Sequence, residues 1–461
     1  MKLRKLIGDR AFYRRLLAVM IPVLVQNVIT NFVGLLDNIM VGQVGTEPMS
    51  GVAIVNQLLF VFNLSIFGGL AGAGIFTAQY YGKSDHEGVR YTFRAKMYMS
   101  VAMVLIATGI MLTMGEELIK LFLHEGEEAL DLTATLEYGK QYMMVMLLQI
   151  PLFALMQVYG STLRETGETM LPMKAGITAV FVNLVFNYIL IFGKFGAPKL
   201  GVVGAAVATV ISRVVECGII VSWTHRHSAR NPFILGAYSS MRVPMHLVKQ
   251  IAIMGLPLLI NEVLWASGNT MLNQSYSMRG LEVVSAVNIA TTVSNLFFCA
   301  FFAMGTTVSI IIGQLLGAGE LERAVDEDTK LIAFGVALCT LVGVVMAVLA
   351  PLVPEIYNTT DTVKQIACRL LMVSAVMMPV NAFTNSCYFT LRSGGKTAIT
   401  FIFDSGFMWL IAVPTAYVLS RFTALPILGL YICVHALEAI KAVIGFVMLK
   451  SKKWVNNLVA N

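Results

Sequence analysis

Apolar residues follow one another along most of this 461-residue chain in long stretches, which short polar connections separate. A helix rises 1.5 Å per residue, so about twenty apolar residues cross a hydrocarbon layer of about 30 Å. Backbone groups in lipid need partners within their own segment, and these stretches are too long and too uniformly apolar for barrel strands. The pattern therefore predicts twelve transmembrane helices, near residues 16–40, 52–81, 97–114, 138–158, 172–193, 201–223, 247–276, 284–315, 331–353, 366–389, 398–419 and 424–449.

The twelve stretches repeat as two halves of six. The element Gln79-Tyr-Tyr-Gly82 recurs as Gln314-Leu-Leu-Gly317, at an offset of 314 − 79 = 235 residues. Pro22 recurs as Pro257 at the same offset, 257 − 22 = 235 residues. Secondary transporters are built from such repeats and bind their substrates near the membrane midplane, where the repeats meet. The duplication thus favours transport over an enzymatic function.

The polar connection at residues 224–246 is the natural boundary between the two halves. We predict an all-α polytopic membrane protein with twelve transmembrane helices in two pseudo-symmetric six-helix lobes. The N-lobe is expected at residues 1–230 and the C-lobe at residues 231–461.

Composition and charge support a membrane protein with a defined orientation. The chain is 57% hydrophobic and only 13% charged, and its net charge is +7. With both ends on one side, 23 of the 33 Lys and Arg residues lie on that side, eight lie opposite and two lie within spans (23 + 8 + 2 = 33). This is the positive-inside distribution of a protein with both termini in the cytoplasm. The basic excess therefore reflects topology and does not indicate a nucleic-acid partner.

The first span carries polar residues on one helical face. Asn27, Asn31, Gly34 and Asn38 are spaced i, i+4, i+7 and i+11, and Asp37 lies beside that face. An unpaired carboxylate at this depth is costly, so Asp37 is expected to face the bundle interior or a wet cavity. There it can take up and release a proton or hold a cation. The alternative is a structural aspartate that joins neighbouring helices.

Glu262 lies in the second half at the position equivalent to Asn27, since 262 − 27 = 235. It follows Pro257 by a little more than one turn, and no basic residue lies within one helical turn of it. The same arguments predict a proton, cation or substrate role for Glu262, with a purely structural role as the alternative.

Uncharged polar pairs occur on two further spans. Asn183 and Asn187 are one turn apart, and with Thr209 on the next span they offer oxygen atoms that suit sodium or a polar ligand. Asn381 and Asn385 show the same i, i+4 spacing. Hydrogen bonding between helices is the alternative for both pairs.

The remaining charges within spans are predicted to pair locally. Arg213 with Glu216, and Glu438 with Lys441, are each three residues apart and can neutralise one another. Asp404 has no such neighbour, so it either pairs with a cation of the preceding loop or contributes to a cytoplasmic gate. The candidate loop cations are Arg392 and Lys396.

Several of these elements together resemble the multidrug and toxic compound extrusion (MATE) family of transporters. The matching elements are Leu36-Asp37-Asn38-Ile-Met-Val-Gly42-Gln-Val-Gly45, Gln79-Tyr-Tyr-Gly82, Leu163-Arg164-Glu-Thr-Gly167, Asn183-Leu-Val-Phe-Asn187-Tyr188 and Gly201-Val-Val-Gly204-Ala-Ala-Val-Ala-Thr209. The resemblance covers essentially the whole chain. It implies two six-helix lobes that export organic, often cationic, compounds by antiport against sodium or protons, in a protein that acts as a monomer.

The resemblance also implies roles for individual residues. The family's cation site in the first lobe matches Asp37, with Asn183, Asn187 and Thr209 as its partners. Many members carry an acid where Asn187 stands, and some carry one where Asn381 stands, so this chain has fewer carboxylates at both places. The glutamate of the seventh helix in several branches matches Glu262, for which a proton-type or substrate-binding role is then favoured.

We therefore expect a cation-coupled antiporter of the bacterial cytoplasmic membrane, with Na⁺ or H⁺ as coupling ion, a small organic molecule as substrate and no other cofactor. The protein is expected to be embedded in the lipid bilayer. A candidate Na⁺ site is formed by Asp37, Asn183, Asn187 and Thr209. The alternatives are a lipid-linked saccharide flippase of the same superfamily and an integral membrane transferase. The residues expected to line the substrate cavity are Asn27, Asn31, Asn381 and Asn385.

Overall fold

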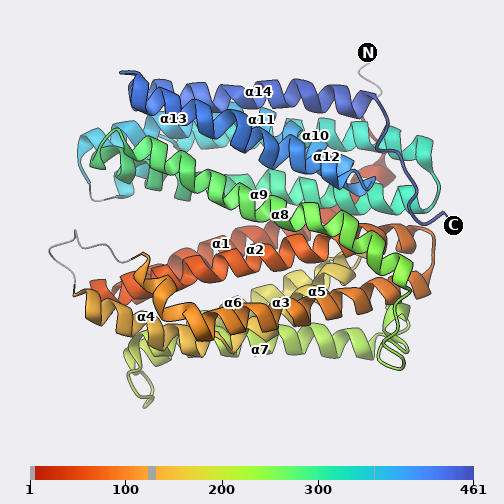
Figure 1. The fold of residues 1–461 in the computed structure, drawn as a ribbon, viewed down its shortest axis with the longest axis horizontal. Coiled ribbons are helices and arrows are strands. Elements are labelled where there is room, and N and C mark those ends of the chain that lie inside the picture. The colour runs from red at the N-terminus through yellow and green to blue at the C-terminus, as the bar shows by residue number, and fades with distance from the viewer. Residues whose placement is uncertain (1–5, 123–130, 358, 461) are drawn as a thin grey trace. The chain divides into compact units, whose positions relative to one another are not determined.

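A computed structural model describes residues 6–122, 131–357 and 359–460, and this part of the chain is helical and contains no β-strand (Figure 1). The α-helices of the first half are α1 (Arg10–Gly42), α2 (Thr46–Gly82), α3 (His86–Lys120), α4 (Leu132–Met146), α5 (Gln149–Glu165), α6 (Met170–Phe192) and α7 (Gly201–Arg226). Those of the second half are α8 (Met245–Ser277), α9 (Leu281–Gly317), α10 (Leu321–Leu349), α11 (Asp361–Ser393), α12 (Thr397–Phe401), α13 (Val413–Phe422) and α14 (Ile427–Lys450).

The predicted spans correspond to these helices. In the described residues, 11 helices are long and apolar enough to cross a membrane, and a bent pair brings the number to 12. That pair is α4 and α5, which meet at an angle of 46° where a single straight span was expected at residues 138–158. The predicted fold class, a polytopic all-α membrane protein, is confirmed.

The chain forms two compact units. Unit 1 comprises Met1–Leu24, Ala78–Asp85 and Ile251–Asn461, and unit 2 comprises Val25–Thr77 and His86–Gln250. The helices α1, α2 and α8 each contribute residues to both units, so the units do not simply follow the order of the chain.

Within unit 1, α11 packs along α9, α10 and α14 around an apolar core. Fully buried side chains of this core include Leu370, Leu371 and Met378 of α11, together with Cys339 of α10 and Leu430 of α14. Within unit 2, α6 packs along α7, and α7 also packs against α4 and α5. These contacts place the polar face of α6 toward α7.

The repeated Gln-x-x-Gly elements contact each other inside unit 1. A Cβ atom on Gly82 would lie 1.9 Å from the carbonyl oxygen of Gln314, and one on Gly317 would lie 1.9 Å from the carbonyl oxygen of Gln79. Small residues allow helix backbones to approach this closely. The repeated glycines are therefore explained by a reciprocal contact, in which each element packs on the backbone of the other.

The segment that follows α14 packs onto the same place. Its Trp454 is only 1% exposed, and the Leu458 backbone N–H donates to Gln79 Oε1 over 2.7 Å. The Lys83 ammonium donates to the Val459 carbonyl oxygen over 2.6 Å. The end of α2 is thus fastened to the C-terminal segment by hydrogen bonds.

The helix that begins with α12 is not regular. Between α12 and α13 it passes through two π-helical stretches, η4 (Ile402–Gly406) and η5 (Met408–Ala412). A π turn inserts extra residues into an α-helix and is frequent at functional sites. The span expected at residues 398–419 is present, but its hydrogen-bond register changes within the segment that carries Asp404.

Candidate functional site

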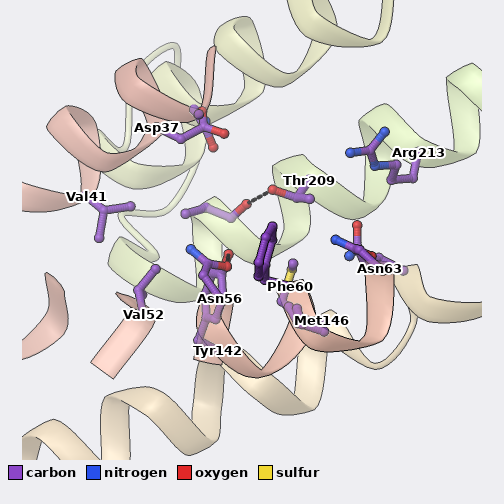
Figure 2. A pocket seen from close by; sticks show the side chains of 15 residues that line it. Asp37, Val41, Val52, Asn56, Phe60, Asn63, Tyr142, Met146, Thr209 and Arg213 are labelled. Atoms are coloured by element: carbon purple, nitrogen blue, oxygen red, sulfur yellow. Dashed lines mark hydrogen bonds between the residues drawn. The ribbon is translucent and has the colours of Figure 1, made fainter. Parts of the chain in front are cut away.

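Unit 2 contains a cavity of about 280 Å³ that is bordered by α1, α2, α4, α5, α6 and α7 (Figure 2). Apolar side chains such as Val41, Val52 and Phe60 share its wall with polar ones. A cavity in which polar groups converge on an otherwise apolar wall is a common form of small-molecule site. The polar residues of its wall are Asp37, Asn56, Asn63, Tyr142, Gln149, Asn187, Thr209 and Arg213.

The carboxylate of Asp37 is held by the amide face of α6. The Asn187 Nδ2 donates to Asp37 Oδ1 over 2.6 Å and also to Asn183 Oδ1 over 3.1 Å. Asn183 Nδ2 donates to Thr209 Oγ1 over 3.3 Å, and the Thr209 hydroxyl donates to the Ala205 carbonyl oxygen over 3.0 Å. Asp37, Asn183, Asn187 and Thr209, which the sequence places on three spans, therefore form one hydrogen-bonded group.

The Asn183 amide can meet Asp37 in two orientations. In one, its oxygen faces the carboxyl group; in the other, its nitrogen donates to Asp37 Oδ1 over 2.8 Å. The first orientation suits a protonated Asp37, which can donate to an amide oxygen, and the second suits an ionised one. With its nitrogen toward the carboxyl group, Asn183 donates to the same oxygen atom as Asn187 does.

No ion pair holds Asp37 among the residues that the structure describes. The cation on the same cavity wall is Arg213, whose Nη1 lies 2.5 Å from Glu216 Oε2 on its own helix. The predicted local pair of Arg213 and Glu216 is therefore confirmed. Arg213 is thus paired with Glu216 on its own helix and forms no ion pair with Asp37.

Other polar atoms in this unit lack partners within the described chain. The Asn187 Oδ1, Asn63 Oδ1 and Gln149 Oε1 atoms are buried and form no hydrogen bond there. Buried polar groups are normally satisfied, so such atoms are expected to bind water, an ion or a ligand. Of the three, Asn187 belongs to the hydrogen-bonded group of Asp37, where its unpartnered oxygen joins carboxylate and hydroxyl oxygens of the kind that alkali cations and polar molecules use.

Four cavity residues were not predicted from the sequence: Asn56, Asn63, Tyr142 and Gln149. Asn56 and Asn63 are seven residues apart, which places them on one face of α2. Asn63, and Asn56 with the adjacent Gln57, interrupt an apolar stretch, and that signal could have found them. The Tyr142 hydroxyl donates to Asn56 Oδ1 over 3.2 Å and so links α4 to α2.

Glu262 lies on α8 in unit 1 and is partly buried. Its side chain forms no hydrogen bond or ion pair within the described residues, although Arg392 and Asp404 are close enough for their fields to act on it. This position is consistent with the prediction that Glu262 is a carboxylate within a span and has no local partner. Its role stays a prediction.

Asp404 has a different partner from those that the sequence suggested. Its Oδ1 lies 2.7 Å from Lys441 Nζ on α14, and its Oδ2 accepts from Asn261 Nδ2 over 3.1 Å. The expected pairing with the loop cations Arg392 or Lys396 is wrong, because the packing of α14 brings Lys441 closer. Lys441 also approaches Glu438 to 3.8 Å, so its expected local partner is the more distant one.

The four asparagines expected in the substrate cavity lie on α1 and α11. Asn27 is partly buried, and Asn31 is exposed and donates to the Asn27 carbonyl oxygen over 3.1 Å. Asn381 and Asn385 are partly buried on α11, and Asn385 Oδ1 has no partner within the described residues. None of the four belongs to the cavity around Asp37, so their assignment to a substrate site stays a prediction.

Comparison with known proteins gives a consistent result. The family model MatE matches residues 22–189 and 257–418, once in each half. "Probable multidrug resistance protein NorM" of Thermotoga maritima is 26% identical over 453 residues, which cover 96% of this chain and 93% of that protein. "Multidrug resistance protein MdtK" of Pectobacterium atrosepticum is 25% identical and covers 88% of this chain and 87% of that protein.

Solved structures share the fold. A structure described as "MATE in the straight conformation" has a TM-score of 0.85 and 20% identity, and covers 98% of both chains. One described as an outward-facing multidrug resistance MATE family transporter of the MOP superfamily has a TM-score of 0.84, 20% identity and the same coverage. The resemblance that the sequence motifs indicated is thus confirmed for both sequence and fold.

Proposed function

Because this chain belongs to the MatE family of membrane transporters, we propose that it exports organic compounds across the cytoplasmic membrane by antiport against an inward-moving cation. Relatives from several bacteria carry the name multidrug resistance protein, which supports export of drug-like compounds. Such a protein needs a group that changes its ionic occupancy during the cycle. The Asp37 carboxylate in the cavity of unit 2 is our candidate.

One observation carries this proposal: Asp37 borders a cavity, accepts a hydrogen bond from Asn187, and forms no ion pair with a described residue. A carboxylate inside a membrane protein that lacks a permanent counterion is expected to bind a proton or a cation. Occupied and unoccupied forms then differ in charge. An ion that prefers one conformation shifts the protein toward it, and the substrate shifts it back.

The site is compatible with either coupling ion. For H⁺, Asp37 takes up the proton and the Asn183 amide accepts the hydrogen bond that the neutral acid donates. For Na⁺, the oxygens of Asp37, Asn183, Asn187 and Thr209 would hold the ion, and the unpartnered Asn187 Oδ1 fits that role. Dye export from vesicles with separately imposed sodium and pH gradients would distinguish the two.

We propose that the substrate contacts apolar side chains and asparagine amides. Glu262 is a carboxylate in addition to Asp37, and it can attract a cationic compound. Its side chain is partly buried and has no described partner to displace. Asn27, Asn31, Asn381 and Asn385 are included as candidate substrate contacts. A Glu262→Gln variant that binds a cationic dye as tightly as the unaltered protein does would remove Glu262 from this role.

We also propose that the protein acts as a monomer with both termini in the cytoplasm, in line with its charge distribution. Labelling of cysteines introduced at Lys83 and at Lys199 with a membrane-impermeant reagent would test the orientation. The first should be protected in intact cells and the second should react.

The proposal is tested by ethidium export from cells that produce an Asp37→Asn variant. The substitution keeps the shape of the side chain but cannot be ionised, so export should fall at least tenfold at equal protein abundance. The matched control is Asp361→Asn, which alters an exposed aspartate in the first turn of α11 and should leave export unchanged. An Asp37→Asn variant that exports normally would refute the role of Asp37.

A further inference from the structure

Unit 1 contains a second group of charged side chains, in which a lysine ammonium lies beside two carboxylates. Lys441 Nζ lies 2.7 Å from Asp404 Oδ1 and 3.8 Å from Glu438 Oε1. The side chains of Lys441 and Asp404 are only 11% and 19% exposed. The ammonium also lies 5.4 Å from the centre of the Phe403 ring, a favourable setting for a cation. A buried cation is thus surrounded by two carboxylates and a ring face.

The fold fixes Asp404 in this position from its other side. Asn261 Nδ2 donates to Asp404 Oδ2 over 3.1 Å, while Asn261 Oδ1 accepts from the Ser405 hydroxyl over 2.7 Å and from the Ser405 backbone N–H over 3.2 Å. The Ser405 hydroxyl also lies 3.0 Å from the backbone carbonyl oxygen of Asn261. These contacts attach the π-helical stretch η4 to α8. The position of Asp404 is therefore fixed by hydrogen bonds between η4 and α8.

The π-helical register explains why the carboxylate can reach both partners. Each π turn rotates the residues after it relative to a regular α-helix, which changes the face that they present. Here the change coincides with Asp404 and Ser405, the residues that meet α14 and α8. We therefore interpret η4 as the element that positions Asp404.

We propose that the Lys441 ammonium is a tethered counterion that occupies a monovalent-cation site formed by Asp404 and Glu438, so that unit 1 excludes an external cation there. A lysine ammonium and a sodium ion carry the same charge, and carboxylate oxygens suit both. A second cation would meet the repulsion of the first at close range. This inference rests on the proposed function, because it assigns coupling-ion binding to Asp37 alone.

The proposal predicts a gain of binding when the tether is removed. Lys441→Met keeps most of the length and the unbranched apolar stem of the side chain and removes its charge, which leaves Asp404 and Glu438 without their resident cation. The vacated site should then bind Na⁺. Lys441→Arg is the matched control, because it keeps a positive charge in the same place.

Binding is measured on purified protein with radioactive Na⁺, in a background of Asp37→Asn that removes the candidate Na⁺ site of unit 2. The Asp37→Asn protein should bind no Na⁺, and Asp37→Asn/Lys441→Met should bind it at least tenfold more tightly than Asp37→Asn/Lys441→Arg. Adding Asp404→Asn to the Lys441→Met protein should abolish the gained binding. Na⁺-dependent stabilisation of the same proteins against heat should follow the same order.

Two results would overturn the proposal. One is Na⁺ binding by the Asp37→Asn protein that disappears with Asp404→Asn, since unit 1 would then accept an external cation beside Lys441. The other is a folded Lys441→Met protein that gains no Na⁺ binding. Should that variant unfold, Lys441→Ala with added methylammonium replaces it, because the added cation can occupy the place of the lysine ammonium. Failure of methylammonium to restore folding would contradict a cation site.

These measurements are independent of transport. If the unaltered protein exports no ethidium, the proposed function fails while the binding results keep their meaning. If export is normal but Lys441→Met gains no Na⁺ binding, only the tethered-cation proposal fails.

Discussion

Asp37 in unit 2 and Asp404 in unit 1 are both carboxylates on membrane helices, but the protein surrounds them differently. Asp37 is held by an asparagine amide at the edge of a cavity, and no described cation pairs with it. Asp404 is held by an asparagine amide as well, and it also contacts the Lys441 ammonium. A charge buried without a partner is costly, and a paired one much less so. The comparison separates a carboxylate that is available for exchange from one that is neutralised permanently.

The largest expected effect concerns stability and is confined to Asp404. Asp404→Asn leaves the Lys441 ammonium buried beside the more distant Glu438, and loss of one partner of a buried pair typically costs about 3–5 kcal/mol. Asp37→Asn removes no ion pair, so by the same reasoning it should lower the free energy of unfolding by less than about 1 kcal/mol. Thermal unfolding of both purified variants measures the difference.

A double variant checks the cause of that effect. Asp404→Asn/Lys441→Met removes both charges, so it should recover most of the stability that Asp404→Asn loses. If the double variant is as unstable as Asp404→Asn alone, the loss arises from the contacts with Asn261, or from the Glu438 carboxylate that has lost Lys441, and not from the unpaired ammonium.

A smaller effect is expected from Asn187→Ala, and it concerns transport. The variant removes the donor to Asp37 Oδ1, a hydrogen bond to a charged group that is worth about 1.5–3 kcal/mol. The ion dependence of export should therefore shift by at least about tenfold. Dye export is measured against a series of sodium concentrations and of pH values. An unchanged dependence on both ions would separate Asn187 from the coupling site.

The smallest effect is expected from Thr209→Val, which keeps the shape of the side chain and removes its hydroxyl. Thr209 contacts Asn183 over 3.3 Å and reaches Asp37 only through it. Loss of one such neutral hydrogen bond costs about 1 kcal/mol, a shift of about fivefold in the same ion dependence. A shift larger than that of Asn187→Ala would indicate that Thr209 contacts the ion directly.

The sequence predicted the group around Asp37 better than the group around Asp404. Asn183 and Asn187 are one turn apart, so helical periodicity alone places them on one face, and the family motif links that face to Asp37 and Thr209. Local spacing also predicted the pair of Arg213 and Glu216. Whatever a single helix determines could thus be anticipated.

Contacts that depend on packing between helices could not be anticipated. Lys441 lies 37 residues after Asp404 (441 − 404 = 37), and their contact follows from the docking of α14. The π-helical stretches near Asp404 have no compositional signature, and neither does the bend between α4 and α5. In each case a tertiary contact decides the outcome, such as the bonds between Asn261 and Ser405.

The mutual packing of the two Gln-x-x-Gly elements has an evolutionary consequence. Because Gly82 touches the Gln314 backbone and Gly317 touches the Gln79 backbone, the contact has the isologous form of a twofold dimer interface. A half-length protein bearing one such element would therefore present a surface complementary to its own copy. The C-terminal segment contacts the two elements differently, through the Gln79 side chain in one and through the Gly317 carbonyl oxygen in the other, and so marks a departure from that symmetry.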